Sequence, residues 1–215
     1  MRSGPEQREL SAEQFTDELD ALAEIYALAM AAPANELPGR MSIMERHAGH
    51  PAFRAVVAVQ PDGRGRYQGQ GEAAAGDRWA LIGFAYGFHG RTGQWWHDVV
   101  TNNLTAQRGS EAAGHWLGDS FEFAEVHVHP DYQARGTGRA MMHALAAGRP
   151  EQTAVLSTPH GQTRARRLYG SLGFVDLLPA FSFPGAGPAY AIMGAVLPLR
   201  GAPPPDARSA SPSRW

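Results

Sequence analysis

Cysteine and lysine are both absent from this chain of 215 residues. Without cysteine there is no disulfide framework, no thiolate metal site and no cysteine nucleophile, so a covalent thioester relay through the protein is excluded. Without lysine there is no Walker A lysine, no strand lysine of the protein-kinase type and no Schiff-base lysine. Several large enzyme classes are therefore ruled out.

Long apolar runs and a strong net charge are also lacking. No segment approaches the roughly 18 apolar residues needed to cross a bilayer, and residues 1–10 contain no apolar stretch of the secretory-signal type. The formal net charge of -2 provides no basic footprint for nucleic acid. We expect a soluble, cytoplasmic protein with neither a membrane nor a nucleic acid as partner. A homodimer is compatible with the sequence, which specifies no oligomeric state.

The residues that are present fit one folded domain. With 43% hydrophobic residues, the chain can bury a single core, and we place the domain at residues 11–200. Residues 1–10 and the proline- and serine-rich residues 201–215 are expected to be disordered because they offer little apolar surface to bury. Within the domain, residues 91–120 have the character of an aromatic insert.

A helix start is well marked at Ser11. Ser11 and Gln14 match a capping box, Leu10 and Phe15 match a hydrophobic staple, and apolar residues continue at helical spacing as far as Met30. Further helices are expected at 41–49, 96–106, 110–117, 137–148 and 163–172, and strands at 53–61, 78–90, 121–130, 153–158, 174–183 and 189–198. The first two strands would form a hairpin around residues 62–77. This order predicts an α/β fold with a central mixed β-sheet flanked by helices.

The segment QARGTG, residues 133–138, stands between an expected strand and an expected helix. Its small side chains leave backbone N–H groups unshielded at a helix N-terminus, which carries partial positive charge and suits a phosphate or pyrophosphate. Arg135 and Arg139 would add charge-assisted hydrogen bonds to the same anion. The alternative is a glycine-rich turn with surface arginines. A dinucleotide fingerprint is disfavoured, because Met142 stands where a third glycine or alanine is wanted.

Two longer stretches favour the anion-binding interpretation. VHPDYQARGTGRA at residues 128–140 and TRARRLYGSLGF at residues 163–174 together resemble the two central motifs of the GNAT (Gcn5-related) N-acetyltransferase superfamily. The resemblance implies the acyl-CoA N-acyltransferase fold, acetyl-CoA as cosubstrate, and transfer of the acetyl group to a primary amine by direct nucleophilic attack. A small-molecule amine is the expected acceptor. The alternatives are a protein or peptide N-terminal acetyltransferase and a non-catalytic acyl-CoA-binding module.

The resemblance also implies which residues contact the cofactor. The strand before the loop would pair its backbone with the pantetheine arm, and the loop N–H groups would hold the pyrophosphate. Gln162 stands where family members often carry an asparagine. The implied cofactor-binding residues are Val126, His127, Val128, Gln133, Ala134, Arg135, Gly136, Thr137, Gly138, Arg139 and Gln162.

Tyr169 is the candidate acid. The resemblance places it near the sulfur of the cofactor, where a hydroxyl would protonate the departing thiolate. Taken from the residues alone, Tyr169 flanks an apolar helical stripe of Ala165, Leu168 and Leu172, and is a core tyrosine with a solvated hydroxyl.

The candidate bases lie on the strand before the loop. Strand alternation places Glu122 on the face of Val126 and Val128, and Glu125 on the opposite face with His127. The resemblance puts the base of some family members at Glu122 and that of others near Glu125, so both are candidate catalytic residues. Either glutamate is alternatively a solvated strand residue.

Contacts with the acceptor are sought in the insert and on the same strand. Trp95 and Trp96 form either a hydrophobic plug or one wall of the acceptor pocket, where an aromatic face suits a cationic amine. His127 is expected in the wall of the site or as a base. His127 and His129 share a strand face, as zinc ligands require, but no third ligand stands at a telling spacing, so no metal is expected.

Overall fold

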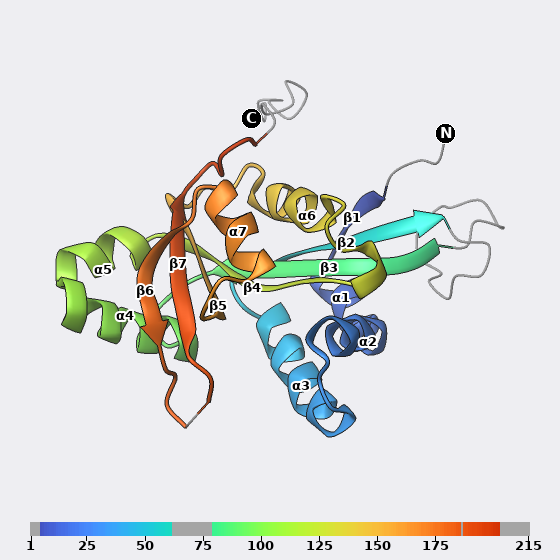
Figure 1. The fold of residues 1–215 in the computed structure, drawn as a ribbon, viewed down its shortest axis with the longest axis horizontal. Helices are drawn as coiled ribbons and strands as arrows, with labels where there is room; N and C mark the ends of the chain where they lie inside the picture. The colour runs from blue at the N-terminus through green and yellow to red at the C-terminus, as the bar shows by residue number, and fades with distance from the viewer. Residues whose placement is uncertain (1–4, 62–78, 186, 203–215) are drawn as a thin grey trace, which may run out of the picture.

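In the described residues 5–61, 79–185 and 187–202, the computed structural model has a seven-stranded mixed sheet at its centre (Figure 1). The strands are β1 (Glu6–Leu10), β2 (Arg54–Pro61), β3 (Trp79–His89), β4 (Ser120–Val128), β5 (Thr153–Pro159), β6 (Val175–Phe181) and β7 (Tyr190–Val196). The helices are α1 (Ala12–Asp17), α2 (Leu19–Met30), α3 (Leu37–Ala48), α4 (Trp95–Arg108), α5 (Ser110–Leu117), α6 (Thr137–Ala146) and α7 (Arg164–Ser171), with short 3₁₀ turns η1 (Ala34–Glu36) and η2 (Pro130–Tyr132). The expected α/β fold class is confirmed.

The sheet changes character at β4. Its order is β1-β2-β3-β4-β5-β7-β6, antiparallel from β1 to β4, parallel between β4 and β5, and antiparallel again through β7 and β6. The parallel pairing joins only Ser120–Glu122 to Thr153–Val155. Beyond those residues the two strands separate.

Helices cover both faces of the sheet. α6 and α7 lie on one face (Figure 1), over a core that includes Met141 and Leu172. Ala154 and Leu156 of β5 point into this core, whereas Val155 between them joins the cluster beneath α4 and α5. The helices α4 and α5 therefore lie on the opposite face, and α1 to α3 cover the β1–β4 half of that face through a third cluster.

The N-terminal segment differs from the expected disorder. Glu6–Leu10 form β1, an edge strand that pairs antiparallel with Ala55–Val59. Leu10 is buried, and the guanidinium carbon of Arg8 lies 4.3 Å from the centroid of the Trp79 ring. The polar composition of this segment led to the wrong prediction, because an edge strand can carry polar residues along its exposed length. The rest of the expected disorder, at 1–4 and 203–215, and the hairpin turn expected at 62–77 lie outside the described residues.

The first helix has the expected start but is interrupted. The Gln14 N–H donates to Ser11 Oγ at 3.1 Å, and the Ser11 N–H donates to Gln14 Oε1 at 2.9 Å, which confirms the capping box. The chain leaves the helix at Glu18 and begins α2 at the next residue. Apolar spacing did not reveal this break, because Phe15 before it and Leu19 after it are buried in the same cluster.

The aromatic insert is a helical part of the core. It forms α4 and α5, which meet at Gly109, a residue with a φ of 86°. Val100 and Leu104 of α4, with Leu117 of α5, are buried against the β5–β7 region. Both helices expected within 91–120 are therefore confirmed, and together they cover a sheet face that would otherwise be exposed.

Candidate functional site

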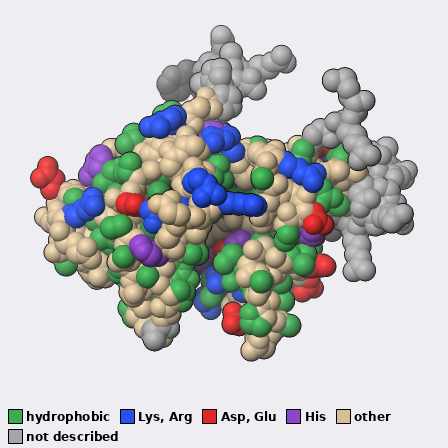
Figure 2. All heavy atoms as spheres, in the orientation of Figure 1, with side chains coloured by type: hydrophobic (Ala, Val, Ile, Leu, Met, Phe, Trp, Pro, Cys, Tyr) green, Lys and Arg blue, Asp and Glu red, His purple; other side chains and the backbone are tan. Residues whose placement is uncertain are grey.

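A cavity of about 700 Å³ opens beside the point where β4 and β5 separate. Its walls come from the end of β4, the loop into α6, one side of α7 and the end of α2. Figure 2 shows arginine side chains grouped at the middle of this face, next to a hollow in the surface. The residues that line the cavity are Ala29, Met30, Val126, His127, Val128, Tyr132, Gln133, Ala134, Gly136, Gly138, Arg139, Arg164, Ala165, Arg167, Leu168, Tyr169 and Ser171.

The loop before α6 presents its backbone donors to this cavity. Ala134 and Gly136 have positive φ values of 60° and 86°, and no side chain caps the helix at Gly136. Within the described residues, the N–H groups from Ala134 to Arg139 have no hydrogen-bond acceptor. Free donors at a helix N-terminus favour an anion. Gln133 fixes the start of the loop, because its side-chain amide donates to the Val128 carbonyl at 3.1 Å.

The two loop glycines serve different purposes. A Cβ added at Gly136 would meet no atom within 4 Å, so the space beside this backbone is open to a ligand. A Cβ added at Gly138 would lie 3.4 Å from Leu168 Cδ2 and 3.8 Å from Val128 Cγ2. Gly138 therefore lets α6 pack closely against β4 and α7, whereas Gly136 leaves room for binding.

Arginines from two helices surround the loop. The guanidinium of Arg139 donates to Ser171 Oγ at 2.6 Å and so ties α6 to α7. Arg164 and Arg167 also line the cavity, and sequence reasoning missed both, although the RARR run in α7 was a signal for them. Gln162 does not line the cavity; its backbone carbonyl accepts from Arg167 Nη1 at 3.4 Å.

Tyr169 reaches the cavity from α7 while being 8% exposed. Burial, assisted by the negative charge of Glu125, raises the pKa of Tyr169 to about 12. Its hydroxyl therefore keeps its proton at neutral pH and is suited to donate it. Tyr169 is both a core residue and a cavity residue, because its ring also packs in the cluster beneath α6 and α7.

A β-bulge changes which strand residues share a face. Tyr86 of β3 is paired with Glu125, but the next residue, Gly87, is paired with Phe123, which leaves Ala124 as an extra residue in β4. The bulge reverses the side-chain alternation on either side of it. Glu122 and Glu125 therefore face the same side of the sheet as His127, and the prediction of opposite faces was wrong.

Glu125 is ionised and held from two sides. Its Oε1 accepts from Arg40 Nη1 at 2.8 Å, and its Oε2 is hydrogen-bonded to His127 Nε2. Burial opposes ionisation, but the hydrogen bond and charge of His127, with the charges of Arg40 and His47, outweigh it and lower the pKa of Glu125. Arg40 comes from α3, and its guanidinium carbon lies 4.7 Å from the Tyr26 ring centroid. Sequence reasoning missed Arg40, for which no local signal existed.

Glu122 has the opposite electrostatic state. It is 5% exposed, and within the described residues its buried Oε2 has no hydrogen-bond partner. Burial raises the pKa of Glu122 to about 8, so the carboxyl is protonated at neutral pH. It does not line the cavity.

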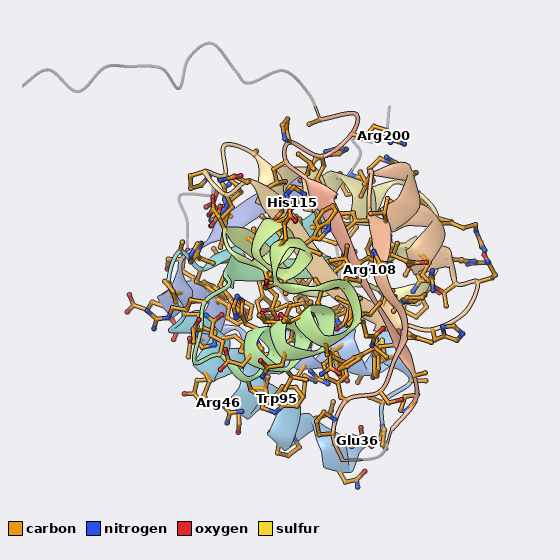
Figure 3. The ribbon with its side chains drawn as sticks, turned by 90° about the vertical axis from the view of Figure 1, so that its left-hand side faces the viewer. Glu36, Arg46, Trp95, Arg108, His115 and Arg200 are labelled. Carbon is orange, nitrogen blue, oxygen red and sulfur yellow. The ribbon has the colours of Figure 1, made fainter. Side chains whose placement is uncertain are left out.

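The paired tryptophans lie away from the cavity. Neither Trp95 nor Trp96 contributes to its lining. Trp95, labelled in Figure 3, is the first residue of α4. It is 60% exposed, and its ring centroid lies 5.5 Å from that of Phe183. Trp96 packs against the cluster beneath α4 and α5. These contacts favour the hydrophobic-plug alternative.

Two further properties concern the described residues as a whole. Among them, no group of three or more His, Asp or Glu side chains is arranged to hold a metal ion. None of the helices placed in residues 5–61, 79–185 and 187–202 is both long and apolar enough to cross a membrane.

Glu122→Gln should remove one pH dependence of stability. Because burial raises the Glu122 pKa from 4.5 to about 8, the folded chain keeps a proton between these values that the unfolded chain has released. The stability tied to this proton is complete below the unfolded pKa and is lost as pH rises through the folded pKa, at up to about 1.4 kcal/mol per pH unit. In urea unfolding at several pH values, the free energy of unfolding of the variant should rise relative to that of the wild type as the pH increases across this window.

The matched control is Glu111→Gln, at an exposed position of α5. Its stability curve should follow that of the wild type across the same pH range. If the curve for Glu122→Gln also stays parallel to the wild type, Glu122 is ionised in the folded protein and the assignment of its protonation state is wrong.

Comparison with known proteins agrees with this geometry. A family model described as an acetyltransferase (GNAT) domain matches residues 81–176. A GCN5-like protein acetyltransferase of Mycobacterium tuberculosis is 35% identical over 195 residues, which cover 84% of this chain and 91% of that protein.

Solved structures share the fold. A GNAT-family protein from Desulfovibrio desulfuricans has a TM-score of 0.58 at 12% identity, covering 90% of this chain and 99% of its own. YncA of Salmonella typhimurium, solved with acetyl-CoA, has a TM-score of 0.52 at 18% identity, covering 94% of this chain and 98% of its own. With a curated relative matched along most of both chains, the protein belongs to the GNAT family and is an acetyl-CoA-dependent acetyltransferase.

Proposed function

We propose that the protein transfers the acetyl group of acetyl-CoA to an amino group of a protein or peptide by direct nucleophilic attack. The observation that carries this acceptor class is the 35% identity, across most of both chains, to a protein acetyltransferase. The competing acceptor is the small-molecule amine expected from the sequence. The tryptophans that were to hold such an amine do not line the cavity, which weakens that alternative.

The shape of the surface also favours a large acceptor. Figure 2 shows it hollowed between the part formed by α2 and α3 and the part formed by the β6–β7 hairpin. His127, which lines the cavity, shares its sheet face with the cluster that α2 and α3 cover. An extended polypeptide fits an open hollow of this kind better than a small amine, which is usually enclosed by its site.

Acetyl-CoA fits the cavity residues. Its pyrophosphate would accept hydrogen bonds from the free N–H groups of Ala134–Arg139, with Arg164 and Arg167 adding positive charge. The pantetheine arm would lie along Val126–Val128, on the strand edge that β5 leaves unpaired. When bound, the cofactor supplies an acetyl thioester. Tyr169, with its proton retained, would donate that proton to the departing sulfur.

Acetyl-CoA should raise the melting temperature of the wild type. At 100 times its dissociation constant a ligand stabilises the folded state by about 2.7 kcal/mol, which amounts to several degrees for a domain of this size. Gly136→Val should abolish the rise by filling the open space beside the loop backbone. Gly109→Val is the matched control, since Gly109 has the same φ of 86° and open space around it. If acetyl-CoA does not change the melting temperature of the wild type, the proposed binding is contradicted.

Tyr169→Phe should lower turnover by about 10²-fold, as removal of a general acid does, while the thermal shift with acetyl-CoA stays unchanged. Free-thiol release measures the turnover. Tyr190→Phe, at a half-buried tyrosine outside the cavity lining, is the control and should retain wild-type turnover. Undiminished turnover in Tyr169→Phe would assign Tyr169 to packing alone.

Lysine peptides should be better acceptors than free polyamines. The experiment compares three acceptors by kcat/KM: a lysine peptide, the same peptide with its α-amine blocked, and spermidine. We expect at least one peptide to exceed spermidine by about tenfold or more, a margin of roughly 1.4 kcal/mol. Because the chain contains no lysine, every acetyl-lysine detected belongs to the acceptor. A preference for spermidine would refute the protein acceptor and leave acetyl-CoA dependence intact.

A further inference from the structure

We propose that His127 is the base that deprotonates the acceptor ammonium, and that Glu125 and Arg40 position it. This inference rests on the proposed amine acetylation and names a catalytic group for it. The sequence left Glu122, Glu125 and His127 open as the base, and the proposal selects His127 among them.

His127 is the group on this face of β4 that reaches the reaction space. It lines the cavity, as does Tyr169 from α7 on the other side. Neither Glu122 nor Glu125 lines it. Both oxygens of Glu125 are already engaged, Oε1 with Arg40 and Oε2 with His127. A proton taken from an acceptor in the cavity therefore meets the imidazole first.

The hydrogen bond to Glu125 selects the useful tautomer. An ionised carboxylate only accepts hydrogen bonds, so the proton of the neutral imidazole resides on Nε2. Arg40 donates to the same carboxylate and keeps it ionised. Nδ1 then retains its lone pair. Within the described residues Nδ1 has no hydrogen-bond partner, and it is not among the fully buried polar atoms that lack one. The free nitrogen is thus the one able to accept a proton.

Aromatic packing fixes the orientation of the ring. The Tyr26 ring from α2 meets the imidazole edge to face at a centroid distance of 5.1 Å, and Phe84 from β3 lies at 5.4 Å. Among the described residues, the titratable or charged groups of other elements that face the Glu125–His127 pair are Arg40 and His47 on α3, Tyr26 on α2, Tyr86 on β3 and Tyr169 on α7.

The proton balance closes with these residues. His127 Nδ1 takes one proton from the acceptor ammonium, and the freed amine nitrogen bonds to the acetyl carbon as the carbon–sulfur bond breaks. Tyr169 gives its proton to the departing sulfur and is reprotonated by the second proton that the nitrogen loses on becoming an amide. His127 then releases its proton to solvent through the cavity. The products are the acetylated amine, the free thiol of CoA and one proton.

The kinetic test compares His127→Gln with His115→Gln, an exposed histidine of α5 shown in Figure 3. We expect His127→Gln to lower kcat/KM for the acceptor by about 10²-fold or more, to lose the acidic limb of the kcat/KM–pH profile, and to keep the thermal shift with acetyl-CoA. His115→Gln should behave as the wild type. A retained acidic limb in His127→Gln, or a loss below about threefold, would overturn the proposal.

Glu125→Gln tests the positioning role. Arg40 offers only donors, so the amide carbonyl of the new side chain must face Arg40 and its NH₂ group must face His127 Nε2. That arrangement forces the imidazole proton onto Nδ1 and leaves this nitrogen without a lone pair to accept the acceptor's proton. Activity should fall to the level of His127→Gln, and the double variant should be no worse. Arg40→Lys, which keeps the positive charge, should retain more activity than Arg40→Gln.

Histidine nitrogen NMR separates this proposal from the acceptor class. Long-range proton–nitrogen spectra, with the His127 signals assigned by their loss in His127→Gln, should show the Nε2–H tautomer in the wild type and the Nδ1–H tautomer in Glu125→Gln. This readout needs no acceptor. An Nδ1–H tautomer in the wild type would refute the His127 base even if proteins prove to be acetylated, and absence of any amine acetylation would refute the proposed function even with the expected tautomer.

Discussion

The separation of β4 from β5 is the constraint on which the rest of the site depends. Two neighbouring parallel strands normally continue their hydrogen bonds along their whole common length. Here the pairing ends at Glu122 and Val155, while the other edge of β5 stays paired with β7 as far as Pro159. The N-terminus of α6 packs closely against α7 and the end of β4, because Gly138 lies next to Leu168 and Val128. An unpaired strand edge, free helix donors and the protonated hydroxyl of Tyr169 thereby converge on one cavity.

One strand holds two carboxyl groups in opposite states. Glu122 and Glu125 face the same side, but within the described residues Glu125 is hydrogen-bonded to Arg40 and His127, whereas a buried oxygen of Glu122 has no partner. Glu125 therefore stays ionised while Glu122 is neutral at neutral pH. Burial raises the pKa of both carboxyl groups. The difference between their pKa values is therefore due to the contacts that Glu125 makes with Arg40 and His127. A fixed negative charge next to an imidazole is useful for proton transfer, whereas a second one nearby would compete for the same cations.

Local signals in the sequence were reliable where the physics is local. The capping box at Ser11, the glycine loop at Gly136 and the ends of α5 depend on neighbouring residues, and the structure has them as expected. The bulge at Ala124 depends on the register with β3, and Arg40 reaches Glu125 from 85 positions away. Neither leaves a mark in the surrounding sequence. The assignment of the base depended on both, which is why strand alternation alone misplaced the two glutamates.

The two ends of the sheet have a consequence for association between chains. The outermost strands are β1 and β6. β1 is five residues long and has an Arg8–Glu6 ion pair, while β6 contains Pro179, which lacks a backbone donor, and departs twice from regular register with β7. An incoming strand would find few consecutive bonding partners at either border. Intermolecular sheet extension, a common route to insoluble fibrils, is thus hindered by the architecture itself.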